Sequence, residues 1–135
     1  MNIQNSEKFY AQAQNFMPGG VNSPVRACRA VGRAPLFIDH AKGSKIYDVD
    51  GNEYIDYICS WGPNILGHAN ERVINAVTET CQRGLTFGAC HSGEIELAEL
   101  IKKHFPSMEM LRLVNSGTEA VMSAIRAARG YTKRD

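Results

Sequence analysis

Residues 113–120 read Leu-Val-Asn-Ser-Gly-Thr-Glu-Ala, an apolar run followed at once by a small polar turn. The pattern predicts a strand over 110–114 and a helix over 118–129. Backbone N–H groups and hydroxyls of such a turn lie at a helix N-terminus, where an anion such as phosphate binds readily. Because Ser116 precedes Glu119 by three residues, the stretch is also a capping box. From these residues alone, capping is the better-supported interpretation and phosphate binding is the alternative.

The composition is that of an ordinary globular chain of 135 residues, with 44% hydrophobic residues and a net charge of +1. A near-neutral charge offers no basic surface, so neither nucleic acid nor an anionic membrane is expected as a partner. No apolar run reaches the roughly 20 residues that a membrane helix needs, and the polar N-terminus lacks the regions of a signal peptide. We therefore expect a cytoplasmic protein.

The four cysteines are widely spaced and form no Cys-x-x-Cys pair; they are Cys28, Cys59, Cys81 and Cys90. This usage predicts reduced free thiols, as in a cytosolic protein. Cys90 and His91 are adjacent, but a zinc site needs a further cluster of cysteine and histidine. No metal is therefore expected.

The first half of the sequence predicts one helix and one hairpin. Apolar residues at helical spacing predict the helix over 6–17, and residues 21–35, which contain two prolines, are expected to be extended or loop. Asp50-Gly51 is a strong two-residue turn signal between alternating segments. It predicts a hairpin of strands 45–49 and 52–57.

The second half predicts a Gly-rich loop over 59–68 and then three helices, over 71–83, 92–103 and 118–129. Ser92 is the expected cap of the second of these helices, and Gly84 and Gly130 are the expected stops of the first and third. One strand between helices cannot form a parallel sheet alone, so this half is expected to begin an α/β layer. A change in character near residues 62–70 is the candidate boundary between the two halves.

Three side chains outside the 113–120 stretch are candidates for ligand binding. Ser23 and Arg26 place a hydroxyl and a guanidinium on one short segment, and a guanidinium matches a carboxylate bidentately. A surface ion pair is the more frequent use of such an arginine. Trp61, the single tryptophan, is suited to stacking on a ligand or to filling a core, and composition alone favours the core.

The histidines and the hairpin acids have structural interpretations of their own. His68 and His91 are of the residue type that titrates near neutral pH, but neither has a carboxylate partner at a telling spacing, so structural roles are favoured. Asp48, Asp50 and Asp56 are expected to face solvent or to support the hairpin turn.

Five motifs in this order resemble one family: GGVNSPVRA (19–27), SWGP (60–63), LGH (66–68), TFGA (86–89) and VNSGTEA (114–120). Together they are similar to the N-terminal part of the glutamate-1-semialdehyde aminomutases, which are class III relatives of the pyridoxal-phosphate aminotransferases. VNSGTEA suits many class III enzymes, whereas VNSPVR is much more specific to the aminomutases. Cys90-His91 departs from the family, which usually has Pro and a small hydroxyl residue there.

The resemblance implies an α/β fold, the N-terminal part of a fold-type-I pyridoxal-phosphate transferase. Residues 1–65 would be an N-terminal segment with helix and hairpin, and residues 66–135 the beginning of the large cofactor-binding domain. Ser116, Gly117 and Thr118 would hold the phosphate of pyridoxal 5'-phosphate. Capping and phosphate binding then coexist, because they use different N–H groups.

The implied substrate residues are Ser23 and Arg26, which would bind the substrate carboxylate, and Trp61, which would line the substrate pocket. The implied activity is that of an isomerase. It would convert glutamate-1-semialdehyde to 5-aminolevulinate, a tetrapyrrole precursor, by internal transamination, with the cofactor passing through its pyridoxamine 5'-phosphate form. The enzyme would be a homodimer.

The resemblance also implies that the chain is an incomplete fragment. No lysine of the chain matches the Schiff-base lysine of the family, so no catalytic residue is assigned and the chain alone is expected to be inactive; the lysines are Lys8, Lys42, Lys45, Lys102, Lys103 and Lys133. Two alternatives stay open. One is a class III ω-aminotransferase with another amino donor, and the other is a short noncatalytic module for phosphate binding or dimerisation.

Overall fold

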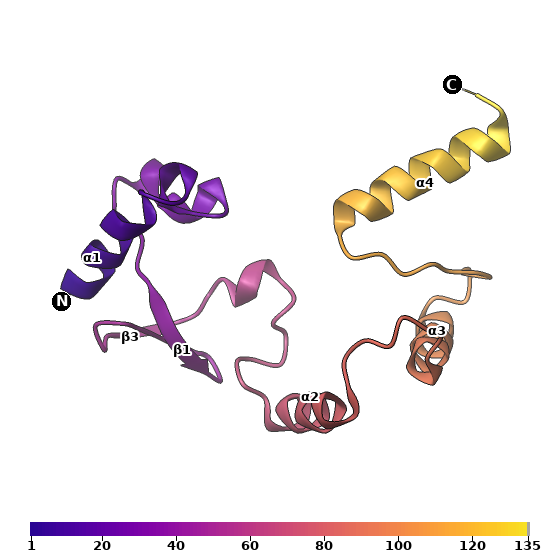
Figure 1. Cartoon of the computed structure of the whole chain (residues 1–135), viewed down its shortest axis with the longest axis horizontal. Helices are drawn as coiled ribbons and strands as arrows, with labels where there is room; N and C mark the ends of the chain where they lie inside the picture. Colours follow the sequence, from indigo (N-terminus) through magenta and orange to yellow (C-terminus); the bar gives the residue numbers. More distant parts are fainter. Residues whose placement is uncertain (135) are drawn as a thin grey trace. The chain divides into compact units, whose positions relative to one another are not determined.

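The computed structural model describes residues 1–134, and these form two compact units, Met1–Leu85 and a second that begins at Thr86 (Figure 1). Each unit is described by itself. The helices are α1 (Gln4–Ala13), α2 (Glu71–Arg83), α3 (Ser92–His104) and α4 (Gly117–Thr132). Four 3₁₀ turns lie in the first unit: η1 (Pro18–Gly20), η2 (Pro24–Ala27), η3 (Arg29–Val31) and η4 (Cys59–Trp61). None of the described helices is both long and apolar enough to cross a bilayer.

A three-stranded antiparallel sheet organises the first unit, with strand order β1-β2-β3. The strands are β1 (Ile38–Lys42), β2 (Lys45–Asp48) and β3 (Glu53–Ile55). The hairpin of β2 and β3 around Asp50-Gly51 confirms the prediction, with slightly shorter strands. β1 was not predicted, because its residues, Ile-Asp-His-Ala-Lys, do not alternate as a half-buried strand does.

The few buried residues of this unit include two polar ones beside the small apolar Ala13 and Ala27. Ser6 and Asp48 are 1% and 2% exposed, and Ser6 is the largest fully buried side chain of the described residues. The Asp48 carboxylate accepts hydrogen bonds from the N–H groups of Asp50 (3.0 Å) and Asn52 (2.8 Å), from Asn52 Nδ2 (2.8 Å) and from Tyr54 Oη (2.8 Å). These donors compensate for its burial.

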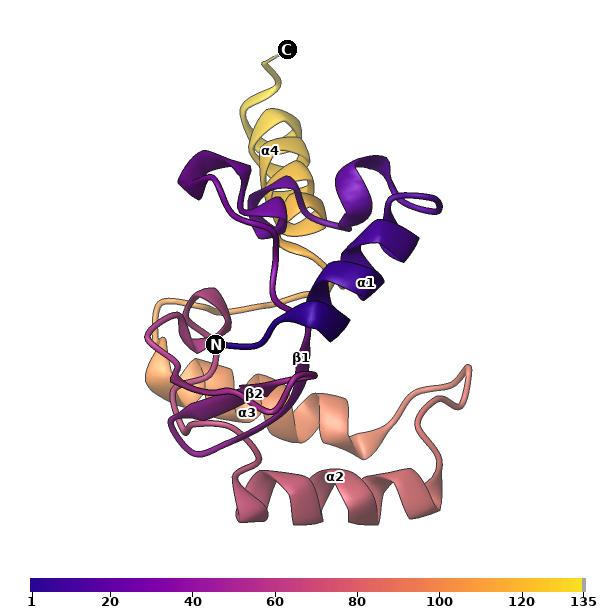
Figure 2. The same ribbon diagram turned by 90° about the vertical axis from the view of Figure 1, so that its left-hand side faces the viewer.

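The next acid of the turn anchors α1 to the sheet. The Asp50 carboxylate accepts the N–H groups of Asn5 (2.8 Å) and Ser6 (3.0 Å) in the first turn of α1, and Ser6 Oγ accepts the N–H of Phe37 (3.2 Å). Figure 2 shows the start of α1 beside the sheet. The expected supporting role of Asp48 and Asp50 is therefore confirmed.

The predicted bounds of the first helix, 6–17, are wrong at both ends. α1 begins at Gln4 because the cap of its first turn comes from Asp50, 44 residues along the chain from Ser6, which no local pattern reveals. It ends at Ala13, where the chain turns ahead of Pro18, so Phe16 is 83% exposed and does not extend the apolar face. Residues 21–35 contain the turns η2 and η3 in addition to extended segments.

Gly20 is required by a close approach. Its φ is +72°, and a Cβ built on it would lie 2.7 Å from the Tyr10 ring of α1. Gly20 is buried, and no larger residue would leave the ring in place. This contact fixes the turn η1, which leads into the segment that carries Ser23 and Arg26.

The helix predicted over 71–83 is confirmed at both ends. Asn70 Oδ1 accepts the N–H groups of Arg72 (3.1 Å) and Val73 (3.4 Å), and Gly84 follows the last turn. Two apolar side chains of this helix are exposed on the described chain: Val73 is 46% exposed and Val77 is 53% exposed.

Three details predicted for the second unit are wrong. The cap of α3 is His91, whose Nδ1 accepts the N–H of Gly93 (3.1 Å), and Ser92 is the first helical residue. α4 continues through Gly130 to Thr132, because one glycine weakens a helix without ending it. Residues 110–114 form no strand, because no other segment of residues 1–134 pairs with them.

We expect Asp48→Asn to lower the free energy of unfolding at pH 7. Burial raises the pKa of Asp48, but the hydrogen bonds from Asn52, Tyr54 and Asp50 outweigh burial and hold that pKa below its ordinary value. The stabilisation is therefore complete above about pH 4 and is lost as the pH falls through the folded-state pKa. Urea denaturation at pH 7 and pH 3 should show the difference between variant and parent narrowing in acid. A difference that widens in acid would contradict the assignment.

A pair of glycine variants isolates the contact with Tyr10. Gly20 and Gly32 both have positive φ, but a Cβ on Gly32 has no heavy atom within 4 Å. Gly32→Ala should therefore cost only the left-handed penalty, about 1–2 kcal/mol, and Gly20→Ala should cost at least about 1 kcal/mol more through overpacking. Equal losses in urea denaturation would show that the Tyr10 ring yields without cost.

Candidate functional site

The N-terminus of α4 is built by a hydrogen-bonded cap. Ser116 has extended backbone angles, and its Oγ accepts the N–H of Glu119 at 3.2 Å. The Glu119 carboxylate in turn accepts the Ser116 hydroxyl at 3.0 Å and the N–H of Asn115 at 3.0 Å. The predicted capping box is therefore present, with the glutamate bonding one residue further back than the usual pattern.

The cap leaves an anion-binding set of donors. Among the hydrogen bonds of the described residues, none uses the N–H of Gly117 or of Thr118. Both groups belong to the first turn of a 16-residue helix, where the helix dipole favours negative charge. A Cβ on Gly117 would have no heavy atom within 4 Å, so the space beside Gly117 itself is open. These donors suit a phosphate group.

Ser23 and Arg26 lie on one tight turn of the first unit. Ser23 is the extended residue before η2, and its carbonyl accepts the N–H of Arg26 at 2.9 Å. Arg26 is exposed, and no carboxylate within residues 1–134 forms an ion pair with it. The guanidinium is therefore not used in the surface ion pair that was the alternative interpretation.

Trp61 lies on a loop of strained backbone. Cys59, Ser60 and Trp61 have φ of 50°, 53° and 66°, and Gly62 follows at 117°. A left-handed conformation costs a non-glycine residue about 1–2 kcal/mol, and such strain gathers at functional sites when the surrounding structure enforces it. Trp61 is 68% exposed, so on the described chain it does not fill a core.

The base of this loop is closed by an aspartate–histidine pair that the sequence did not reveal. His68 Nε2 lies 2.6 Å from Asp56 Oδ2, and their side chains are 21% and 7% exposed. Asp56 was expected to face solvent or to support the hairpin turn, but its side chain is buried beyond the hairpin, against His68. No spacing rule links residues 12 positions apart, so only the fold shows the pair. His91 also has a structural role, as the cap of α3.

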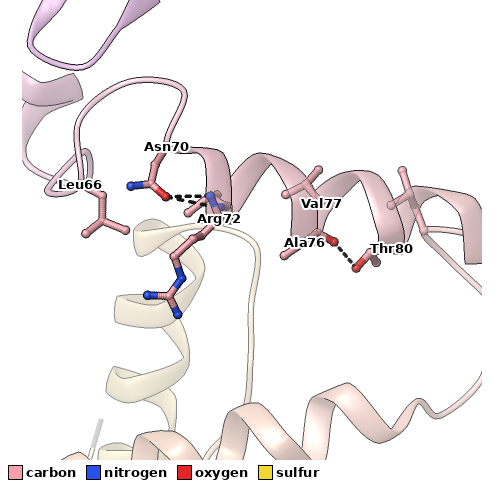
Figure 3. A pocket seen from close by; sticks show the side chains of 8 residues that line it. Leu66, Asn70, Arg72, Ala76, Val77 and Thr80 are labelled. Carbon is pink, nitrogen blue, oxygen red and sulfur yellow. Dashed lines mark hydrogen bonds between the residues drawn. The ribbon is translucent and has the colours of Figure 1, made fainter.

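The described contacts do not unite the predicted site residues. Ser23 and Arg26 lie on η2, Trp61 on η4, and Ser116, Gly117 and Thr118 in the second unit. The groove in Figure 3 has a volume of about 660 Å³ and includes none of them; it is lined by one face of α2 with Leu66 and Leu85.

All four cysteines are free thiols, as predicted.

The chain is similar to known proteins over its whole length. A glutamate-1-semialdehyde 2,1-aminomutase of Thermodesulfovibrio yellowstonii is 64% identical over 135 residues, which is 100% of this chain and 32% of that relative. The enzyme of the same name from Clostridium novyi is 60% identical over 96% of this chain and 30% of its own length. The chain thus spans about a third of the length of these curated relatives.

Solved structures and a family model agree with this likeness. A structure described as a transaminase with PLP bound superposes with a TM-score of 0.90 at 36% identity, over 99% of this chain and 31% of that one. The model of the class III aminotransferases matches residues 27–135. The fold is thus that of the pyridoxal-phosphate-dependent class III enzymes, and the chain belongs to the class III aminotransferase family.

Proposed function

We propose that the whole protein to which this chain belongs is a pyridoxal-phosphate-dependent aminomutase. It isomerises glutamate-1-semialdehyde to 5-aminolevulinate, as the names of its relatives suggest. One observation carries the proposal: identity of 64% extends over every residue of the chain to a protein of that name. We also propose a homodimeric, cytoplasmic enzyme, with the N-terminal segment over 1–65 and the cofactor-binding domain beginning at residue 66.

The cofactor phosphate is held at the N-terminus of α4. The N–H groups of Gly117 and Thr118 would donate to it, and the helix dipole would add to the attraction. Ser116 shapes this turn through its hydroxyl, which is shared with Glu119. When bound, pyridoxal 5'-phosphate or its pyridoxamine form supplies an electron sink and carries the amino group. Phosphate binding and capping use separate donors, so neither weakens the other.

The substrate carboxylate is bound by the turn at η2. Arg26 offers two parallel N–H donors to a carboxylate, and the Ser23 hydroxyl lies at the start of the same turn. Binding at the carboxylate holds the substrate by its unreactive end, which fixes the orientation of the carbons that exchange the amino group. Trp61 lines the same pocket with a flat apolar face that excludes water.

A class III aminotransferase is the second candidate, favoured by the structural neighbour described as a transaminase, at 36% identity. The two activities differ in what must be added. An aminomutase gives an amino group to the aldehyde and takes another from the same molecule, so the aminated cofactor is regenerated, whereas an aminotransferase needs a separate donor and a separate acceptor. Turnover without any added amino compound therefore separates them.

We expect the product of the complete coding sequence, loaded with pyridoxamine 5'-phosphate, to form 5-aminolevulinate from glutamate-1-semialdehyde over many turnovers without an added amino donor. Product measured against active-site concentration is the readout. An aminotransferase would consume about one equivalent of the semialdehyde per site and then stop, releasing 4,5-diaminovalerate and no 5-aminolevulinate, because each amino group transferred empties the cofactor. Such a stop would overturn the proposal.

A proline at the first position of α4 tests the phosphate site. Gly117→Pro removes one N–H donor, while proline suits the first helical position and the extended Ser116 before it. Loss of a hydrogen bond to a charged group costs about 1.5–3 kcal/mol, so the Kd for pyridoxamine 5'-phosphate should rise roughly tenfold or more. Gly117→Ala, which keeps the N–H, is the matched control. Unchanged affinity of the proline variant, measured by fluorescence titration, would exclude this donor.

A further inference from the structure

The hydrogen bonds of the loop over 57–67 join it to the rest of the first unit only at its base, although residues 63–67 also line a cavity with Val73 and Ile74 of α2. Its internal hydrogen bonds include Trp61 N–H to the Ile58 carbonyl (3.0 Å) and Gly62 N–H to the Cys59 carbonyl (3.0 Å). Among the described residues, no hydrogen bond joins this loop to any residue outside 56–68. The hydrogen bonds of the loop that carries Trp61 therefore meet the rest of the unit at residues 56 and 68.

Asp56 and His68 both have two roles at this base. One carboxylate oxygen of Asp56 accepts the N–H groups of Ile58 (2.8 Å) and Cys59 (3.1 Å), which begins the loop, and the other lies 2.6 Å from His68 Nε2. The backbone of His68 exchanges two hydrogen bonds with Gly43, at 2.9 and 2.8 Å. The pair thus joins both ends of the loop to the sheet.

The charge state of the pair follows from its contacts. The hydrogen bond from His68, together with the N–H groups of Ile58 and Cys59, holds the pKa of Asp56 below its ordinary value. An ionised carboxylate only accepts hydrogen bonds, so His68 Nε2 carries the proton and donates it toward Asp56 Oδ2. The bond is charge-assisted and largely shielded from water.

The backbone leaves little freedom at the same point. Gly67 has a φ of +76°, and a Cβ on it would lie 2.9 Å from the Gly43 carbonyl oxygen. The loop therefore closes tightly against the sheet beside His68. Such closure is the external constraint that the consecutive left-handed residues 59–61 require.

We propose that Asp56 and His68 are positioning residues that act through Trp61, holding the strained loop in the conformation that presents the indole to the substrate. The structural part of this proposal concerns the loop alone, and the substrate part rests on the proposed function. Asp56 and His68 act on the substrate only through Trp61 and do not contact it themselves.

The first test follows Trp61 itself by ¹⁹F NMR of the complete protein labelled with 5-fluorotryptophan, with the Trp61 resonance identified by its loss in Trp61→Phe. Asp56→Asn replaces one acceptor oxygen by an amide donor, which must face either His68 Nε2–H or the N–H groups of Ile58 and Cys59. His68→Ala removes the partner, so each substitution should broaden or split that resonance. His68→Gln, which restores a donor near Nε2, should return a single line.

Asp39→Asn is the matched control, because Asp39 forms a pair with His40 at 2.8 Å that is exposed and lies on β1, away from the loop. It should leave the Trp61 resonance unchanged. A Trp61 resonance that is the same in Asp56→Asn, His68→Ala and the parent protein overturns the proposal. This readout needs no enzyme activity, so it stands or falls separately from the proposed function.

The second test is a double-mutant cycle in the aminomutase assay. Asp56→Asn should raise the KM for glutamate-1-semialdehyde roughly tenfold with kcat nearly unchanged, as expected for lost uniform binding. In a Trp61→Ala background the same substitution should have no further effect on KM. Additive effects of the two substitutions would show that Asp56 does not act through Trp61.

Discussion

The first unit depends on the buried carboxylate of Asp48. A charge taken out of water is costly unless donors replace the lost hydration, and here two backbone N–H groups, an amide and a phenol surround it. These donors come from the turn and from β3, so the carboxylate fixes the hairpin. Asp50 is thereby directed at the first turn of α1. Few large apolar side chains are buried in this unit, so this polar network carries much of its order.

Local signals predicted the elements whose determinants lie within a few residues. Asn70 and Gly84 bracket α2 because a cap and a left-handed stop act on the adjacent turn. Asp50-Gly51 specified the hairpin for the same reason. The start of α1 was missed because its hydrogen-bonding partner, Asp50, is remote in sequence. The strand β1 was missed because its residues do not alternate, although its partner β2 follows it closely in the chain. Residues 110–114 have a strand-like sequence, but strand formation also requires a partner.

In the candidate site, too, local spacing predicted the structural roles of residues but not their ligands. Ser116 and Glu119 were recognisable as a cap from their spacing, and the structure shows that this cap leaves Gly117 and Thr118 with open donors. Spacing could not decide whether those donors bind phosphate, because a helix start alone looks the same with and without a ligand. Arg26 is a similar case, since its surroundings show that it has no ion pair among the described residues, while its assignment to a substrate carboxylate rests on the VNSPVR motif.

One device recurs at the three hairpin acids. Asp48 accepts the N–H groups of residues 50 and 52, Asp50 those of residues 5 and 6, and Asp56 those of residues 58 and 59. Each carboxylate therefore fixes the backbone at the start of a turn, a helix or a loop. Through α1 and the Tyr10–Gly20 contact, Asp50 supports the segment that leads to Ser23 and Arg26; through the loop base, Asp56 supports Trp61. A short hairpin with little apolar core can thus position both segments that we propose to bind the substrate. It uses carboxylates whose backbone donors are fixed in direction, whereas apolar contacts are not directional.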